Sequence, residues 1–369
     1  MLVILQGFFV FVAFLVILLL IWEVRFNFIR RKWPPGPRGS PFIGNLKELE
    51  LGSLLEKFKE LRKEYGNVFT ITVLHRPLII VNGYEALRHL LCKEGDSTSD
   101  RPPYLTEHNP DLLGIVSSSG ALWKEHRSFG LKTFKELGLG KQNIYDQVEL
   151  EASILISDIL KSDDEQLKIT LEEFFNAGTE SVTSTLRWTF VYLVHYPEVQ
   201  RNMQQEIDDV IGRSRMPMMT DKDSLPYCEA VILEVLRIRP AAPLGGPRSL
   251  SRDVHYKGYT LPKDAILFAN VYSVSEDESS FPNPERFDPN RFLDDAGKIC
   301  RQSDILPFST GPRVCMGEAL ARIELFIFLV SIVQRFTFLP EDDMNMPSVK
   351  GNLGITLSPK PYKVRAVPR

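Results

Sequence analysis

One cysteine stands in a glycine-rich segment near the C-terminus of the chain. Cys315 lies in FSTGPRVCMG, Phe308 to Gly317, and a long apolar helical pattern follows it. A thiolate can hold a metal where backbone N–H groups and a helix N-terminus face the sulfur, and Gly311 and Gly317 permit such a loop. Arg313 offers a fork-shaped cation to a nearby carboxylate. Taken alone, however, the segment favours a core cysteine at a helix start.

Two further segments carry polar groups at helical spacing. Trp123 and Arg127 share one helix face, and their N–H donors suit a ligand carboxylate, although an amphipathic surface helix explains them equally well. Glu234 and Arg237 are three positions apart and can form one buried ionic unit. Most pairs with this spacing are solvated, so the pair alone indicates little.

A Gly-Thr pair interrupts an otherwise apolar helical pattern in FFNAGTESVTSTLRW, residues 174–188. Gly178 and Thr179 loosen the backbone ladder locally, and Glu180 and Ser181 follow with an acid and a hydroxyl. A packing face of small residues is the alternative, more plausible for the later hydroxyls of the segment than for this triplet.

These residues must be positioned by a large core. The chain has 369 residues, 44% hydrophobic and 25% charged, with a net charge of −3. This balance is ordinary for a globular protein and gives no indication of a nucleic-acid partner. The four cysteines have no short regular spacing, which predicts free thiols in a reducing compartment instead of disulfides or a zinc site.

The N-terminal segment predicts a membrane anchor. Leu2 to Trp22 carries no charge and is long enough, as a helix, to cross a bilayer core of roughly 30 Å. A cleaved signal peptide is less suitable, because the apolar run is long and no small-residue cleavage site follows. Basic residues follow the run and none precedes it, which predicts a cytosolic body. We expect an anchor at 1–22, a basic, proline-rich hinge at 23–45 and one domain at 46–369.

Periodicity predicts a mainly α body with a small β sheet. We expect helices at 54–65, 122–137, 150–160, 171–196, 198–211, 227–238 and 318–336, and strands at 68–74, 77–83, 254–261 and 266–272. Further short strands are expected in TFLP and GITLSP, and proline-rich irregular chain at 281–308.

The cysteine segment matches F-x-x-G-x-R-x-C-x-G at every fixed position. It resembles the haem-binding loop of the cytochrome P450 family, in which a cysteine thiolate is the proximal iron ligand. The resemblance implies that Cys315 is the axial ligand of the haem iron. It also implies that Phe308, Gly311, Arg313 and Gly317 bind the cofactor, haem b.

The same resemblance assigns roles to the other segments. Trp123 and Arg127 carry over as contacts to a haem propionate, and Arg101 in DRPP and Arg248 in GPRS resemble further propionate positions. The family pairs its E-x-x-R helix with an arginine in a downstream P-x-R-F. Arg286 and Arg291 both fit, and we choose Arg291, which lies closer to the haem loop, as the structural partner of Glu234 and Arg237.

Ala177, Gly178, Thr179 and Glu180 are similar to the family's A-G-x-[D/E]-T motif, which opens a groove for oxygen and supplies protons. Ser181 stands where threonine is usual. It keeps the hydroxyl and loses the methyl group that helps to fix the rotamer. The resemblance therefore implies a proton relay that persists with looser coupling.

The chain as a whole resembles microsomal, family-2-type members. This implies a truncated cytochrome P450 fold in the endoplasmic reticulum membrane, inserting one oxygen atom from O2 into a fatty acid, steroid or xenobiotic. NADPH would supply electrons through cytochrome P450 reductase, with cytochrome b5 as a further partner. Lys124, Arg127, Lys132 and Lys135 offer a basic face to an acidic reductase, or simply a solvated helix face.

The middle of the chain departs from the family. Only 54 positions (177 − 123) separate Trp123 from Ala177, and no segment replaces the helices that roof the substrate cavity. An unroofed site admits water and exposes apolar helix faces. We therefore expect impaired haem incorporation and turnover. The alternative function is an inactive shortened isoform that keeps the anchor and the reductase-facing surface. The remaining walls at 103–113, 241–246 and 354–356 indicate an apolar pocket and nothing narrower.

Overall fold

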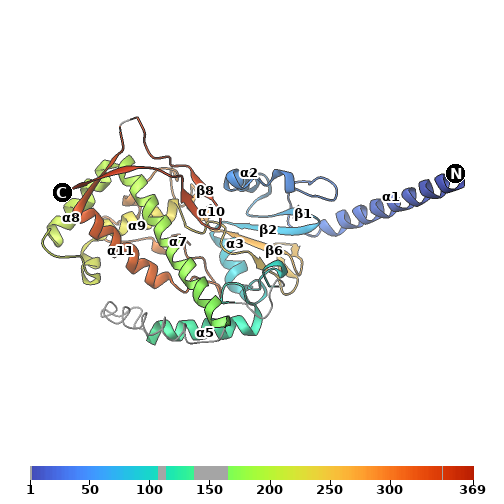
Figure 1. Ribbon diagram of the computed structural model, residues 1–369, viewed down its shortest axis with the longest axis horizontal. Helices are drawn as coiled ribbons and strands as arrows, with labels where there is room; N and C mark the ends of the chain where they lie inside the picture. The colour runs from blue at the N-terminus through green and yellow to red at the C-terminus, as the bar shows by residue number, and fades with distance from the viewer. Residues whose placement is uncertain (1, 107–113, 137–164, 343) are drawn as a thin grey trace.

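The computed structural model describes residues 2–106, 114–136, 165–342 and 344–369. One long helix projects from a body that has a small sheet beside the junction and a group of helices at the far end (Figure 1). The predicted helix at 150–160 lies outside the described residues. The mainly helical body with minor sheet agrees with the prediction from periodicity.

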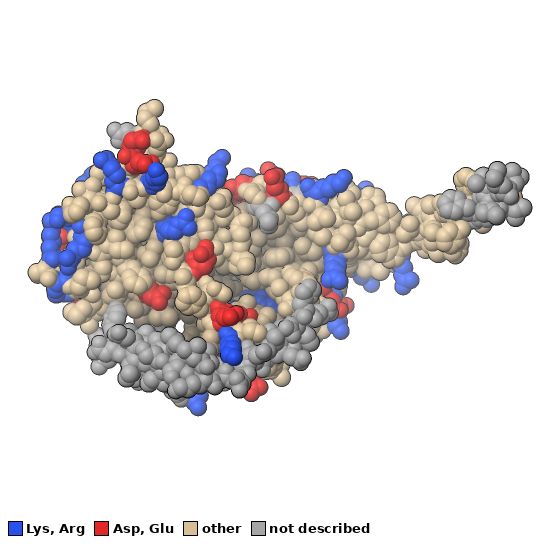
Figure 2. Space-filling model, viewed as in Figure 1, with Lys and Arg blue, Asp and Glu red and all other residues tan. Residues whose placement is uncertain are grey.

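Helix α1, Leu2–Arg30, is the projecting element. Its segment Phe9–Arg30 has a mean hydropathy of 2.5 and buries none of its most apolar window, so it is long and apolar enough to cross a membrane. Figure 2 shows it without charged side chains along most of its described length, and lysine and arginine side chains gather where it joins the body. The helix continues past Trp22, so the first basic residues of the predicted hinge are helical.

The main sheet has the strand order β1-β2-β6-β3. Strands β1 (Val68–Val73) and β2 (Arg76–Asn82), which agree with the strands predicted at 68–74 and 77–83, form an antiparallel hairpin. Strand β6 (Ile266–Asn270) pairs in parallel with β2, and β3 (Arg248–Ser249) pairs antiparallel with β6. Helix α2 (Leu54–Tyr65) packs on this sheet through a cluster of apolar side chains. The sheet thus fixes Arg248 next to β6 and close to β2, a strand that is far away in sequence.

Four long helices form the larger core. They are α7 (Glu165–His195), α8 (Pro197–Val210), α9 (Pro226–Ile238) and α11 (Glu318–Arg335). Every residue of α9 from Cys228 to Ile238 is buried, which is the pattern of a helix enclosed on all sides. Trp188 from α7 and Phe326 from α11 are fully buried in the same cluster. This core fixes the elements on either side of the candidate site.

Shorter elements complete the body. The helices are α3 (Tyr84–Arg88), a π-helical turn at His89–Lys93, α4 (Pro103–Thr106), α5 (Gly120–Glu136) and α10 (Tyr272–Ser275). The strands are β4 (Val254–Tyr256), β5 (Tyr259–Leu261), β7 (Phe336–Pro340), β8 (Gly351–Leu353), β9 (Leu357–Pro359) and β10 (Val364–Pro368). Turns of 3-10 helix lie at Leu46–Glu48, Leu51–Ser53, Gly95–Ser97, Met219–Ser224, Pro289–Phe292 and Gln302–Asp304.

Candidate functional site

The cysteine loop is a rigid turn pressed against the π-helical segment. Gly311 has φ +79, and a Cβ atom there would lie 1.8 Å from the Leu91 carbonyl oxygen. Glycine is therefore required by both torsion and space. The Cys315 N–H donates to the Phe308 carbonyl at 3.0 Å and closes the loop. The loop thus holds the cysteine at one defined position before α11.

The Cys315 side chain is open to solvent on one side and surrounded by protein on the others. The residue is exposed, yet the protein that surrounds the sulfur on its other sides buries it enough to raise the pKa of the thiol. The N–H of Gly317 donates to the sulfur and, together with the Arg127 charge, opposes that rise. Gly317 itself has an ordinary φ of −87, so the structure uses its N–H at the start of α11 rather than its torsional freedom.

Four arginines from separate segments gather beside the cysteine loop. Arg127 donates from Nη2 to the carbonyl oxygen of Val314, one residue before the cysteine. Arg101 donates to the carbonyls of Val116 and Pro247. Arg248 is 3% exposed and lies 3.3 Å from the Ser309 hydroxyl. With Arg313, which is described next, they form what we call the arginine cluster.

Arg313 organises the wall between α5 and the loop. Its guanidinium lies 4.0 Å over the ring of Trp123, which is 6% exposed. It donates to the backbone carbonyls of Ser99, Ile115 and Ser118. The sequence suggested a carboxylate partner for this side chain, and among the described residues the bonds of Arg313 go to backbone instead. Arg313 therefore ties together three segments of the site wall.

The arginine cluster fits an anionic group. Burial first, and then the charge of Arg101, lower the pKa of Arg248 to about 9, and burial with the neighbouring arginines lowers that of Arg313 to about 9. Nη1 of Arg248 is buried without a hydrogen-bond partner in the described part of the chain. Buried cations need counter-charges, and a ligand bearing two carboxylates would supply them. The residues present thus fit the propionate side of haem.

The predicted oxygen-site residues lie on α7. The Ser181 hydroxyl donates to the Ala177 carbonyl at 2.7 Å, four residues back along the helix. Oε1 of Glu180 accepts hydrogen bonds from Thr356 and Ser358, each at 3.1 Å, and so faces the β8–β9 hairpin. Both recorded partners of the Glu180 carboxylate therefore lie on the hairpin. The structure records no hydrogen bond between Glu180 and Ser181.

Helix α7 is bare where these residues lie. Every residue from Phe175 to Glu180 is exposed, and together they cover all sides of more than one helical turn. Phe175 is 73% exposed, and Phe129 on the neighbouring α5 is 60% exposed. These exposed apolar side chains agree with the expectation that the missing segment leaves helix faces uncovered.

Glu234 and Arg237 form the centre of a buried ionic network. Both guanidinium contacts to the carboxylate are 2.7 Å, and both side chains are at most 1% exposed. Nε of Arg291 lies 3.5 Å from the same carboxylate, without hydrogen-bond geometry. Arg286 is exposed and contributes its backbone carbonyl. The structure therefore brings Arg291, and not the side chain of Arg286, to the network.

The remaining predicted residues fall into two groups. Lys124, Lys132 and Lys135 are exposed on α5, whereas Arg127 turns inward to the cysteine loop. The basic face proposed from sequence thus consists of the three lysines. Of the predicted cavity walls, residues 107–113 lie outside the described part of the chain.

One residue of the site wall was missed. Oε2 of Glu173, on α7, accepts from the Val116 N–H at 2.7 Å, and Oε1 accepts from the Ser117 hydroxyl at 2.8 Å. A Cβ atom on Gly114 would lie 2.2 Å from this carboxylate. The sequence gives no signal for this contact, because the two segments meet only in the folded chain.

A family model described as "Cytochrome P450" matches residues 34–169 and 160–366. The chain belongs to the cytochrome P450 family. Cytochrome P450 2D19 of Callithrix jacchus is 30% identical over 472 aligned positions, covering 92% of this chain and 95% of the relative. Cytochrome P450 2C8 of Homo sapiens is 28% identical over 464 positions, with the same 92% and 95% covered. This cytochrome P450 is thus a member of a family of haem monooxygenases, related to microsomal family-2 proteins.

The alignment with cytochrome P450 2D19 shows that this chain is the shorter of the two. It is 472 positions long and the chain has 369 residues, so at least 103 positions (472 − 369) have no residue in this cytochrome P450. The family model likewise matches in two segments that meet near residues 160–169. The shortened region predicted from the spacing of Trp123 and Ala177 therefore coincides with the break in the family match.

Proposed function

We propose that this chain is a membrane-anchored haem-thiolate monooxygenase that acts on lipophilic substrates. The observation that carries the proposal is the position of Cys315, whose exposed thiol lies near Arg127 of the arginine cluster and whose loop is fixed at the N-terminus of α11. The contacts to the anionic and the apolar parts of the haem would follow from this position of the cysteine. Helix α1 would anchor the protein in the endoplasmic reticulum membrane, which its apolar length and the microsomal relatives support.

The chain's own residues divide the work of holding haem. Cys315 would ligate the iron, and the Gly317 N–H with the dipole of α11 would moderate the basicity of the sulfur. Trp123, Arg101, Arg127, Arg248 and Arg313 would hold the propionates. Phe308 and Gly311 would shape the loop. The Glu234–Arg237–Arg291 network would keep the chain before the loop in place, with its Asp288 N–H donating to Glu234 at 2.9 Å.

Bound haem supplies a redox-active iron whose thiolate ligand favours cleavage of the O–O bond. On α7, the Ser181 hydroxyl and the Glu180 carboxylate would hold and pass protons. Ala177, Gly178 and Thr179 would form the turn that makes room for oxygen. The exposure of this turn gives solvent direct access, so the chain controls proton supply less tightly than an enclosed site would.

Electrons would come from NADPH through cytochrome P450 reductase, with cytochrome b5 as a second donor. Lys124, Lys132 and Lys135 on α5 offer an exposed basic face to an acidic partner. A fatty acid, a steroid or a xenobiotic would occupy the apolar side of α7.

The test is a carbon-monoxide difference spectrum of the reduced full chain. We expect a thiolate-type Soret band, and we expect Cys315→Ser to abolish it while Cys300→Ser leaves it unchanged. Cys300 is partly buried and lies outside the loop, so it controls for loss of any thiol. A parent protein that binds haem without the thiolate-type band would overturn the proposed ligand.

A second candidate function follows from the bare turn of α7. With Phe175 73% exposed, water reaches the oxygen side, and turnover would be slow or absent even when haem is bound. The chain would then occupy reductase without oxidising substrate. Adding it to a membrane with an active cytochrome P450 and limiting reductase would inhibit product formation, and excess reductase would relieve the inhibition. NADPH-dependent oxidation of a lipophilic probe by the chain alone would exclude this candidate.

A further inference from the structure

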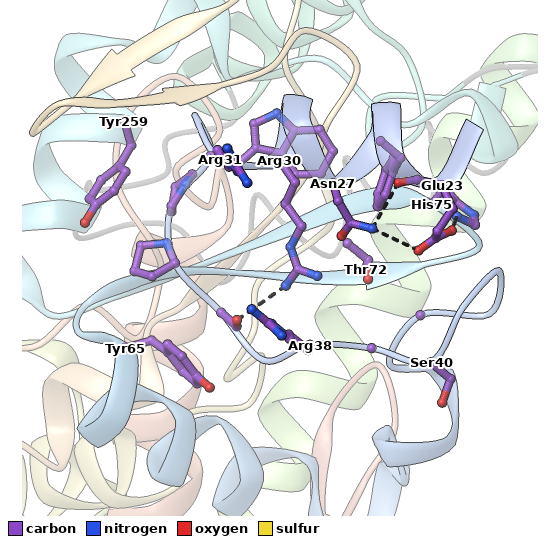
Figure 3. Close-up of a pocket in the computed structure, with 17 residues that line it drawn as sticks. Glu23, Asn27, Arg30, Arg31, Arg38, Ser40, Tyr65, Thr72, His75 and Tyr259 are labelled. Carbon is purple, nitrogen blue, oxygen red and sulfur yellow. Dashed lines mark hydrogen bonds and ion pairs between the residues drawn. The ribbon is translucent and has the colours of Figure 1, made fainter. Parts of the chain in front are cut away.

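A cavity of about 650 Å³ lies where α1 meets the body (Figure 3). It is bounded by the last turns of α1, the proline-rich hinge that follows and the β1–β2 turn, with Tyr65 and Tyr259 at its edge. Its lining shares no residue with the arginine cluster. The volume lies within the range of small-molecule sites. The cavity is therefore a separate candidate for ligand binding.

The walls of this cavity are held by the sheet. The Thr70 N–H donates to the Pro35 carbonyl at 2.8 Å, and the Asn45 N–H donates to the Thr72 carbonyl at 2.6 Å. A Cβ atom on Gly36 would lie 1.9 Å from the Thr70 carbonyl oxygen, so the hinge backbone is pressed onto β1. The hinge is consequently a fixed wall of the cavity.

Arginine side chains dominate the charge of the cavity. Arg30 extends into its middle, with Arg38 below it, and Arg31 lines it as well (Figure 3). Nη2 of Arg30 donates to the carbonyls of Gly36 and Pro37, which fold the hinge back over the helix end. In the described part of the chain, none of these three arginines forms an ion pair with a carboxylate.

The single acidic side chain of the lining is already engaged. Glu23 contacts His75 Nε2 at 3.1 Å and accepts from the Asn27 side chain at 3.2 Å. This pair lies to the right of the arginines in Figure 3. The cavity therefore presents net positive charge to whatever enters it, and guanidinium groups bind phosphate oxygens in a fork geometry.

Aromatic side chains mark the level of this cavity along α1. The rings of Trp22 and Phe42 stack at 6.2 Å, and those of Phe26 and Trp33 meet edge to face at 5.6 Å. Tryptophan gathers at the headgroup level of a bilayer, and the helix above it is apolar and exposed. A phosphate that reaches the cavity from this level would be carried by a lipid.

We propose that this cavity binds the phosphate of an anionic phospholipid headgroup, with Arg31 and Arg38 as its main charged contacts. The proposal rests on the membrane anchoring proposed above. The acyl chains would lie along the exposed apolar surface of α1, while Arg30 keeps the hinge closed around the headgroup. A bound lipid would then fix the angle between the anchor and the body.

The test measures binding of short-chain lipids to the full chain in neutral detergent, by native mass spectrometry and by titration calorimetry. The probes are dioctanoyl phosphatidylserine, dioctanoyl phosphatidylcholine and inorganic phosphate. We compare the parent with Arg31→Gln/Arg38→Gln and with the control Arg25→Gln/Lys32→Gln. The control removes the same charge from exposed residues at the same helix end that do not line the cavity.

We expect the parent to prefer phosphatidylserine and the cavity variant to bind it roughly tenfold more weakly for each arginine removed, with the control unchanged. An equal loss in both variants would reduce the effect to general surface charge and overturn the site. Inorganic phosphate that binds as tightly as phosphatidylserine would overturn the lipid assignment. Separately, failure of the full chain to float with phosphatidylcholine vesicles would refute the anchoring, whatever the result in detergent.

Discussion

Replacing Arg248 by methionine should stabilise the protein without haem and weaken its binding of porphyrin. The guanidinium is 3% exposed, one of its nitrogens has no hydrogen-bond partner among the described residues, and burial holds its pKa at about 9. Such a side chain is costly in the folded protein unless an anion accompanies it. The two opposite effects distinguish a ligand-binding arginine from a structural one.

The magnitude follows from the pKa. A fall from 12.5 to about 9 means that the folded protein disfavours the charged form by roughly 5 kcal/mol, as an upper bound. Replacement of buried ions by packed apolar groups recovers about 1–4 kcal/mol in practice, and loss of the Ser309 hydrogen bond costs about 1 kcal/mol. We expect a net gain of about 2 kcal/mol. Below pH 9 both folded and unfolded chains keep the proton, so the gain is complete at neutral pH. It shrinks as pH rises from 9 towards 12.5, because the folded parent then sheds its proton first.

The assay is thermal unfolding of the haem-free protein, followed by titration with protoporphyrin IX. For Arg248→Met we expect a rise in Tm of about 3 °C and a loss of porphyrin affinity of about tenfold to a hundredfold. Arg252→Met is the matched control, since this arginine is exposed and bonds at the surface with Glu94. A lower Tm for Arg248→Met, or unchanged porphyrin affinity, would refute the reasoning.

Three further changes test the frame of the site. Glu234→Gln leaves its arginine partners buried without a counter-charge and should cost about 3–5 kcal/mol of unfolding free energy, whereas Arg286→Gln should cost under about 0.5 kcal/mol by denaturant unfolding. Gly311→Ala should abolish thiolate-type carbon-monoxide binding, while Gly258→Ala, at φ +85 with open space, should cost only about 1 kcal/mol and keep it. Burial raises the pKa of Tyr362 to about 12, so its share of stability is complete below pH 10 and is lost between pH 10 and 12. Tyr362→Phe should flatten the pH dependence of Tm over that interval, and an unchanged slope would contradict the assignment.

The sequence predicted best those elements that depend on local pattern. Helix α2 was predicted at its observed bounds, and α9 and α11 within one residue at each end, because the periodicity that predicts them lies within each segment. The π-helical turn at His89–Lys93 and strand β10 were not predicted. The turn is shaped by the cysteine loop that packs on it, and the strand by its pairing with β7, so neither has a local signal.

The candidate site shows the same division. Spacing alone placed Arg127 on a face with Trp123, but it gave no indication that the bonds of Arg313 go to backbone carbonyls or that Glu173 bonds the segment at 116–117. Glu180 illustrates the limit most clearly. Its motif predicts a role in a proton relay, and it gave no indication that the carboxylate accepts hydrogen bonds from two hydroxyls of the β8–β9 hairpin. Such contacts depend on which distant segments meet, which a motif does not encode.

The position of the missing segment explains why the haem side of the site keeps its geometry. Contacts between the cysteine loop and the arginine cluster join α5 and earlier residues directly to residues after 230. The glutamate network joins residues after 230 to one another, so both sets of contacts form within the described part of the chain. The oxygen side is different. Residues 175–180 of α7 could be covered only by another segment packing on the helix, and in the structure they are exposed. Loss of that segment therefore separates two functions that usually go together. Under the proposed function, cofactor binding would depend on contacts that remain, and exclusion of water would depend on contacts that are absent from the described chain. This separation predicts the outcome for a variant in which the apolar turn around Phe175 is covered. Such a variant should gain turnover with no change in porphyrin affinity.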